Sequence, residues 1–348
     1  MTAPDESATS GTNDDARRRP AKAGGVGVLN LAGASSIEPL RFGVVGSTFG
    51  DRGWSDHVRR IEDAGVSTLL IRDHFVARAY GPQLAPFSAL ATAAAVTSRL
   101  HVGTMVLSND YRHPALVAHE AATIQSLSGG RFELGLGAGW YEPEYRAAGM
   151  SFDPPGGRIR RLVESLDIIS RLLAGEEVHH SGGYYHLDGL SLDGLMDLPS
   201  PPPILVGAGG SRMLRVAARC ADIIGILPAP IRGADDRDDP RDRLPAAFEA
   251  KVRTLQSAAG DRFPELEISA LITVRISDSR RSSTQELISE RGWTGIEVAD
   301  VWKMPTVFIG SSAQIREDII ARRDRYHLSY LVCADQYLPL LAEIIAGL

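Results

Sequence analysis

Alternation of strand-like and helix-like segments is the feature that most limits how this chain can fold. Eight short segments, most of them apolar at consecutive positions, are typical of parallel strands covered on both faces. They occupy residues 41–46, 67–71, 101–107, 131–137, 203–207, 222–227, 268–274 and 328–333. A segment of helical period follows each strand, at 54–65, 86–98, 114–127, 158–174, 211–220, 244–258, 312–326 and 338–347.

Eight strand–helix units in about 300 residues predict a (β/α)8 (TIM) barrel in residues 40–348. A doubly wound open sheet is the alternative. Two insertions are expected, residues 175–202 after the fourth helix and 277–311 after the seventh strand, the latter with a short helix near 284–291. Residues 230–243, with five Asp and four Arg, read as a solvated loop or as a lid.

The composition is that of a globular protein, with 44% hydrophobic and 23% charged residues. A net charge of −6 with intermixed signs offers no basic surface for nucleic acid or anionic lipid, and no apolar run is long enough for a membrane span. We expect a cytoplasmic protein. Residues 1–39 predict a disordered tail, with an arginine-containing export signal at 17–36 as the alternative.

A carboxylate and an imidazole directly follow the second predicted strand, at Asp73 and His74. Chemistry in such barrels takes place on the loops after the carboxyl ends of the strands, where a polar pair can face a pocket. Imidazole can transfer a proton at neutral pH with modest tuning, so His74 is a candidate acid or base poised by Asp73. A purely hydrogen-bonding role for His74 is the alternative.

The turn after the fifth predicted strand is rich in glycine. In "LVGAGGSRM", Gly207, Gly209 and Gly210 precede a helix that opens at Ser211. Free backbone N–H groups and the positive end of the helix dipole would converge there, which indicates a phosphate cradle. A plain glycine-rich turn that binds no phosphate is equally compatible with these residues.

Two other patterns carry less information. "GLGAGW" at 135–140 resembles a dinucleotide fingerprint, but it lies on the fourth strand instead of the first, so a nicotinamide cofactor is not expected. His179, His180 and His186 lack a carboxylate or cysteine at a matching spacing, and the sequence therefore predicts no metal site.

Several long segments together resemble the bacterial luciferase-like superfamily, in particular its branch that uses the deazaflavin coenzyme F420. They are "LLIRDHF", "VGTMVLSNDYRHPALVAHEAATIQSLSGGRFELGLGAGWYEPEY", "PPPILVGAGGSRMLRVAARCADIIGI" and "MPTVFIGSSAQIREDIIARRDRYHLSYLVC". The resemblance covers residues 40–348 nearly continuously. It implies a homodimeric barrel with the cofactor ring lying across the carboxyl-terminal mouth.

The resemblance also implies roles for individual positions. A non-proline cis peptide bond is expected between Met105 and Val106, bulging against the ring. Asp73 and His74 would contact the ring and mediate proton transfer. The remaining cofactor positions would be Ala138 and Gly139 beside the ring, and Gly207, Ala208, Gly209, Gly210 and Ser211 at the phosphate.

The chain departs from the sugar-phosphate dehydrogenases of this branch at two positions. Trp140 replaces a glutamate and Pro143 an asparagine, which makes a sugar phosphate doubtful and suggests a flatter or more apolar substrate. Glu142, Glu144 and Tyr145 are possible acid or hydrogen-bonding groups, and the last two are equally compatible with a structural role. The catalytic candidates are therefore Asp73, His74, Trp140 and Glu142.

These residues suggest an F420-dependent oxidoreductase that moves a hydride between the deazaflavin C5 and a small organic substrate, with His74 as proton donor or acceptor. One alternative is an FMN-dependent monooxygenase that uses reduced flavin and oxygen. Another is a non-catalytic barrel that binds a cofactor or a partner. The identity of the substrate and the direction of hydride transfer stay open.

Overall fold

A computed structural model describes residues 39–46, 53–77, 81–194, 200–228 and 239–348. The predicted tail, apart from residue 39, and the alternative export signal lie outside these ranges. Most of the predicted acidic loop 230–243 lies outside them as well.

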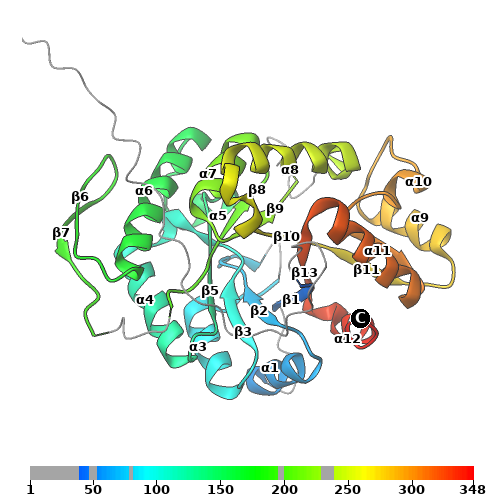
Figure 1. The fold of residues 1–348 in the computed structure, drawn as a ribbon, viewed down its shortest axis with the longest axis horizontal. Coiled ribbons are helices and arrows are strands. Elements are labelled where there is room, and N and C mark those ends of the chain that lie inside the picture. Colours follow the sequence, from blue (N-terminus) through cyan, green and yellow to red (C-terminus); the bar gives the residue numbers. More distant parts are fainter. Residues whose placement is uncertain (1–38, 47–52, 78–80, 195–199, 229–238) are drawn as a thin grey trace, which may run out of the picture. The chain divides into compact units, whose positions relative to one another are not determined.

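The strands form one closed parallel barrel with helices around it (Figure 1). Each strand pairs with its neighbours in the order β3-β2-β1-β13-β10-β9-β8-β5, and β3 also pairs with β5, which closes the sheet. The (β/α)8 barrel is confirmed, and the open sheet is wrong. The strands are β1 Arg41–Gly46, β2 Thr68–Ile71, β3 His101–Thr104 continued by β4 Leu107–Ser108, β5 Phe132–Gly137, β8 Ile204–Ala208, β9 Ile223–Ile226, β10 Glu267–Leu271 and β13 Leu328–Ala334.

A helix follows each barrel strand, as predicted. Proline stands in the first turn of five of these helices, α3, α4, α6, α8 and α12, where a missing N–H removes no hydrogen bond. Among the described residues no helix combines the length and apolarity needed to cross a membrane. The eight helices are α1 Trp54–Asp63, α3 Pro86–Val96, α4 Pro114–Leu127, α6 Pro155–Leu173, α7 Ser211–Cys220, α8 Pro245–Ala259, α11 Ser312–Tyr326 and α12 Leu338–Ile345.

Apolar side chains pack on both faces of the barrel strands, which explains why the strands are apolar at consecutive positions. All residues of β2, β5 and β9 are buried. One large cluster lies between strands and helices. A second cluster consists of Val45, Leu70, Leu205, Ile223, Tyr330 and Val332, with Met105 and Val106 partly buried against it.

The third strand is interrupted where the resemblance placed a cis bond. β3 ends at Thr104, the Met105–Val106 peptide bond is cis, and β4 resumes at Leu107. The expected cis bond is confirmed, and the prediction of one continuous strand over 101–107 is corrected. Glycine in β5 leaves room for this bulge, because a Cβ on Gly137 would lie 2.7 Å from Cγ2 of Val106.

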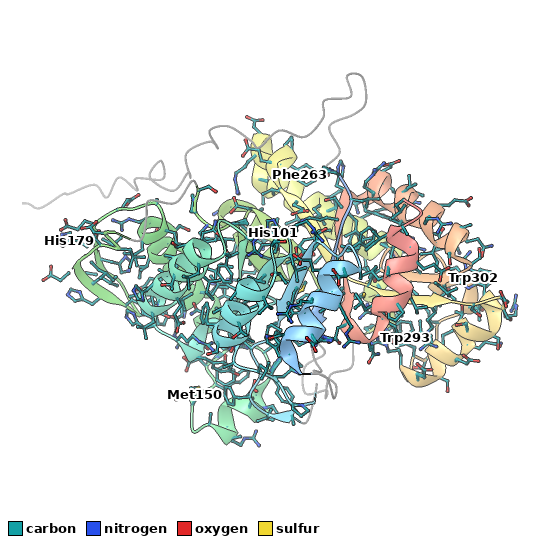
Figure 2. All side chains as sticks on the ribbon, turned by 90° about the horizontal axis from the view of Figure 1, so that it is seen from below. His101, Met150, His179, Phe263, Trp293 and Trp302 are labelled. Carbon is teal, nitrogen blue, oxygen red and sulfur yellow. The ribbon has the colours of Figure 1, made fainter. Side chains whose placement is uncertain are left out.

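The first insertion is a hairpin. Within residues 175–202, β6 Val178–Ser181 pairs antiparallel with β7 His186–Leu190. The sequence predicted only a long connection there. Figure 2 shows His179 at the outer end of this hairpin.

The second insertion contains its own small sheet. The predicted strand 268–274 is in fact two strands, because β10 ends at Leu271 and β11, Thr273–Ile276, pairs with β12, Val307–Gly310, in a separate sheet. Between them lie α9 Arg280–Glu290, which confirms the helix expected near 284–291, and α10 Val298–Val301. Trp293, labelled in Figure 2, is 8% exposed and packs there with Leu287, Val301, Met304, Val307 and Ile309.

A charged cluster lies at the amino-terminal end of the strands. Arg41 of β1 donates to both carboxylate oxygens of Glu267 at 2.6 Å, and also to Glu133 of β5. Its guanidinium lies 3.6 Å from the ring centroid of Tyr330. Because Glu133 is 2% exposed, Arg41 compensates a buried negative charge. Its hydrogen bonds to Glu133 and Glu267 also join β1 to β5 and β10.

Candidate active site at the carboxyl end of the barrel

Asp73 ties the end of the second strand to the end of the third. It is 5% exposed, and its carboxylate accepts two hydrogen bonds from the Arg112 guanidinium, at 2.6 and 2.9 Å. The backbone N–H of Ser108 donates to the same carboxylate at 3.0 Å. A bidentate pair of this kind fixes the orientation of the carboxylate and also stabilises its negative charge. The sequence did not identify Arg112, although its loop follows the third strand.

His74 is held by a carboxylate distant in sequence. Its Nδ1 lies 2.8 Å from Oε2 of Glu144, 70 residues further along the chain. The sequence-based expectation was that Asp73 would orient this imidazole, whereas Asp73 bonds Arg112 and Ser108. Consecutive residues in extended backbone point to opposite sides, so neighbours in sequence are poorly placed to pair. The His74 side chain is 13% exposed.

Glu144, on the short helix α5 Glu142–Ala147, is fully buried and accepts four hydrogen bonds. Oε1 accepts from the backbone N–H groups of Phe75 and Val76, at 2.6 and 3.0 Å. Oε2 faces His74 and accepts from the Tyr111 hydroxyl at 2.9 Å. Burial opposes ionisation, but these donors outweigh it and lower the pKa of Glu144. The carboxylate is therefore ionised at neutral pH.

Aromatic side chains border the imidazole. The Trp140 ring centroid lies 6.1 Å from that of His74 at an interplanar angle of 86°, and the Tyr141 ring lies 6.2 Å away at 88°. Trp140 is 40% exposed and Phe75 is 53% exposed. Two large apolar surfaces thus remain open to solvent beside the histidine.

Glu142 does not share this environment. Its side chain is 55% exposed and bonds Arg146, four residues on, at 2.9 Å. Such i,i+4 pairs are common on exposed helix surfaces. We therefore leave Glu142 out of the catalytic set that the sequence predicted.

The turn after β5 is held by hydrogen bonds from Arg158 and by close packing against Tyr145. Arg158 of α6, 7% exposed, donates to the backbone carbonyl oxygens of Ala138, at 3.2 Å, and Gly139. Gly139 has a φ of 72°, and a Cβ there would lie 1.8 Å from the Tyr145 hydroxyl. That hydroxyl bonds Ser108 at 2.8 Å. Only glycine fits, and the predicted ring-lining backbone is rigidly placed.

The glycine turn after β8 leads directly into α7, whose N-cap is Gly210. A glycine N-cap has no side chain that could hydrogen-bond to the first N–H groups of α7, and a Cβ on Gly210 would meet no described atom within 4 Å. An anionic group such as phosphate could therefore be accommodated at the start of this helix. A Cβ on Gly207 would lie 3.5 Å from Val106, so the end of β8 adjoins the bulge of the third strand.

Two of the three histidines of the hairpin, His179 and His180, pair with local carboxylates. His179 lies 3.1 Å from Glu177 and 3.3 Å from Asp188, and His180 lies 3.1 Å from Glu164. Within the described ranges, no group of three or more His, Cys, Asp or Glu side chains could hold a metal ion.

A family model described as luciferase-like monooxygenase matches residues 52–327. This match covers most of the chain, and the chain therefore belongs to that family.

Individual relatives carry two kinds of name. An F420-dependent glucose-6-phosphate dehydrogenase of Gordonia bronchialis is 34% identical over 216 residues, which are 60% of this chain and 61% of that protein. A 4-hydroxyprotoasukamycin monooxygenase of Streptomyces nodosus subsp. asukaensis is 31% identical over 240 residues, 67% of this chain and 60% of that protein. The chain thus matches less than two thirds of the length of either.

Among solved structures, an F420-dependent secondary alcohol dehydrogenase in complex with an F420-acetone adduct has a similar fold. The TM-score is 0.69 at 14% identity, over 89% of this chain and 98% of that one. At this identity the likeness supports the barrel fold alone.

Proposed function

We propose that this protein is an F420-dependent oxidoreductase that transfers a hydride between the deazaflavin C5 and a small organic substrate. The observation that carries the proposal is the glycine N-cap of α7, which follows directly after β8, while Gly207 of β8 lies beside the Met105–Val106 bulge at the carboxyl end of the barrel, where His74 also lies. The names of relatives such as the Gordonia bronchialis dehydrogenase support the same cofactor.

When bound, the deazaflavin supplies two-electron hydride chemistry at C5. Its phosphate would be held by the backbone of Gly207, Ala208, Gly209 and Gly210 with Ser211. Met105, Val106, Ala138 and Gly139 would lie against the ring, and Asp73 would contact it while Arg112 keeps the aspartate in place.

His74 would donate or accept the proton that balances the hydride. The ionised carboxylate of Glu144 would stabilise the imidazolium form of His74. Trp140, edge-on to the imidazole, would cover the reacting atoms and exclude water.

The exposed aromatic surface beside His74 favours an apolar substrate over a sugar phosphate. Phe75 and Trp140 offer apolar area and no positive charge for a phosphate group. We expect kcat/KM for secondary alcohols to rise with apolar ring size and to exceed that for glucose 6-phosphate. A higher value for the sugar phosphate would contradict this substrate class.

Cofactor titration tests the central proposal. We expect the purified protein to bind F420 more tightly than FMN, and we expect its F420-reduced form to consume no oxygen. Tighter binding of FMN, with oxygen uptake on reduction, would instead support the FMN-dependent monooxygenase; the Streptomyces relative is named a monooxygenase.

We also propose a cytoplasmic homodimer with no nucleic-acid or membrane partner. Leu116 and Leu127, eleven residues apart on α4 and so on the same side of the helix, are 60% and 71% exposed, and a partner subunit would cover them. Light scattering on the purified protein should give twice the chain's 37.4 kDa.

A further inference from the structure

We propose that the groove between α7 and α8 is a binding site for a small phosphate-bearing molecule, separate from the candidate active site. The groove has a volume of about 500 Å³, which is within the usual size of small-molecule sites. This site does not depend on the proposed function.

The groove lies on the outside of the barrel, between two helices that pack side by side (Figure 1). α7 begins at Ser211, directly after the carboxyl end of β8, whereas Arg219, which lines the groove, lies about 12 Å further along the helix. Ser257, in the last turn of α8, lines the groove as well. A ligand in the groove would therefore lie away from His74 and from the glycine turn.

Three arginine side chains give the groove its charge. Arg215 and Arg219 come from α7 and Arg253 from α8, and all three are exposed. The described residues that line the groove include no carboxylate. Because Arg215 and Arg219 are four positions apart on one helix, their positive charges repel each other. An anion bound in the groove would offset that repulsion.

Few carboxylates are available to neutralise these arginines. α7 contains no acidic residue, and within the part of the chain that the structure describes the guanidinium groups of Arg215 and Arg219 form no hydrogen bond or ion pair. Arg253 lies 4.0 Å from Glu249, which accepts a hydrogen bond from Arg325 at 2.7 Å. One shared carboxylate thus leaves the groove with an excess of positive charge.

Arginine suits a phosphate group because its planar guanidinium donates parallel hydrogen bonds to phosphate or carboxylate oxygens. A phosphate monoester presents three acceptor oxygens, enough for one arginine each, whereas a carboxylate presents two. Ser257 adds a hydroxyl donor. The hydroxyl of Thr254 instead donates to the backbone carbonyl oxygen of Ala250, at 2.8 Å.

Pyrophosphate is the probe, titrated into the full chain by calorimetry at physiological ionic strength. The glycine turn after β8 is a second place for an anion, so the titrations use Gly210→Asp, whose carboxylate excludes an anion from the start of α7. We expect this protein to bind one pyrophosphate per chain. Malonate, a dicarboxylate of similar size, should bind more weakly by about threefold or more.

Arg215→Gln together with Arg219→Gln removes two of the three guanidinium groups. In the Gly210→Asp background this change should raise the Kd for pyrophosphate by about 10-fold or more. Ser257→Asp is an independent variant that keeps all the arginines and places a carboxylate in the groove, and it should weaken binding to a similar extent. All these positions are exposed, so circular dichroism should show folded proteins.

Arg59→Gln together with Arg146→Gln is the matched control. These two arginines are exposed on other helices and pair with Asp56 and Glu142, so the same net charge is lost away from the groove. The Kd for pyrophosphate should change by less than about twofold.

Absence of pyrophosphate binding to Gly210→Asp would overturn the proposal. An unchanged Kd in the variant that lacks Arg215 and Arg219, or an equal loss of affinity in the control, would overturn it too. Tighter binding of malonate than of pyrophosphate would contradict the assignment to a phosphate-bearing ligand.

Discussion

His74 is the residue on which the proposed chemistry depends. Replacing it by alanine removes the proton donor and acceptor but leaves the glycine turn after β8 intact. We therefore expect His74→Ala to lower kcat by about 100-fold or more, with a less than about threefold change in the Kd for F420. His119→Ala, on the exposed side of α4, is the control and should leave kcat unchanged. Wild-type turnover in His74→Ala would remove this residue from the reaction.

Glu144 should make stability depend on pH in a defined direction. Its folded-state pKa lies below the ordinary 4.5, so the unfolded chain takes up protons first as the pH falls. The stabilisation is complete above about pH 4.5 and is lost as the pH drops through the lower, folded value. The difference in free energy of unfolding between wild type and Glu144→Gln should therefore shrink as the pH falls below 4.5.

Urea titrations at several pH values would measure that difference. A difference that widens below pH 4.5 would contradict a lowered pKa for Glu144.

At this scale the sequence pointed to His74 as a candidate but did not predict which carboxylate contacts it in the structure. Asp73 was the natural choice because it is adjacent, whereas Glu144 reaches His74 only after α5 has folded against the loop following β2. Arg158 was missed for the same reason, since its contacts with Ala138 and Gly139 join separate elements. A single sequence contains no signal for such pairings.

At the scale of the element, a substitution at the start of α7 should change the stability of the protein and its affinity for F420 in opposite directions. Gly210→Asp places a carboxylate at the N-cap, where it should accept hydrogen bonds from the first N–H groups and stabilise the helix by about 0.5 kcal/mol or more. The same carboxylate would repel a phosphate. We expect a higher Tm together with a Kd for F420 weakened by about 10-fold or more.

Gly210→Ser supplies a neutral cap at the same place. It should raise Tm by less, because serine carries no charge to interact with the helix dipole, and it should weaken F420 binding less, so the difference between the two variants isolates the charge. Unchanged F420 affinity in Gly210→Asp would mean that the phosphate binds elsewhere.

The sequence predicted helices and strands correctly where the pattern of apolar residues continued along the whole element. It did not predict the point at which one apolar run passes from the barrel sheet into a second sheet. The eight strand–helix units were recognised because buried parallel strands are apolar throughout. The break between β10 and β11 was not, because the apolar run continues through Ile272 without a turn signal. The hairpin of β6 and β7 was hidden by its exposed, polar residues.

At the scale of the whole molecule, barrel closure depends partly on Arg41. Arg41→Met would leave Glu133 buried without its guanidinium, and losing one partner of a buried pair costs about 3–5 kcal/mol. Because this cluster lies at the amino ends of the strands, kcat should not change in the folded fraction. Arg59→Met, which removes an exposed pair with Asp56, should cost less than about 1 kcal/mol.

Guanidinium chloride unfolding and steady-state kinetics would measure both variants. Equal stability of the two proteins would show that Arg41 contributes no more than a surface charge.

The segment formed by β11, α9, α10 and β12 has an apolar cluster separate from those of the barrel. A segment with its own interior can open cooperatively while the rest of the chain stays folded. Amide hydrogen exchange should therefore show residues 273–310 exchanging as one group, at a lower free energy than the barrel strands. Such a segment can also accumulate substitutions in its interior during evolution without disturbing the residues around His74.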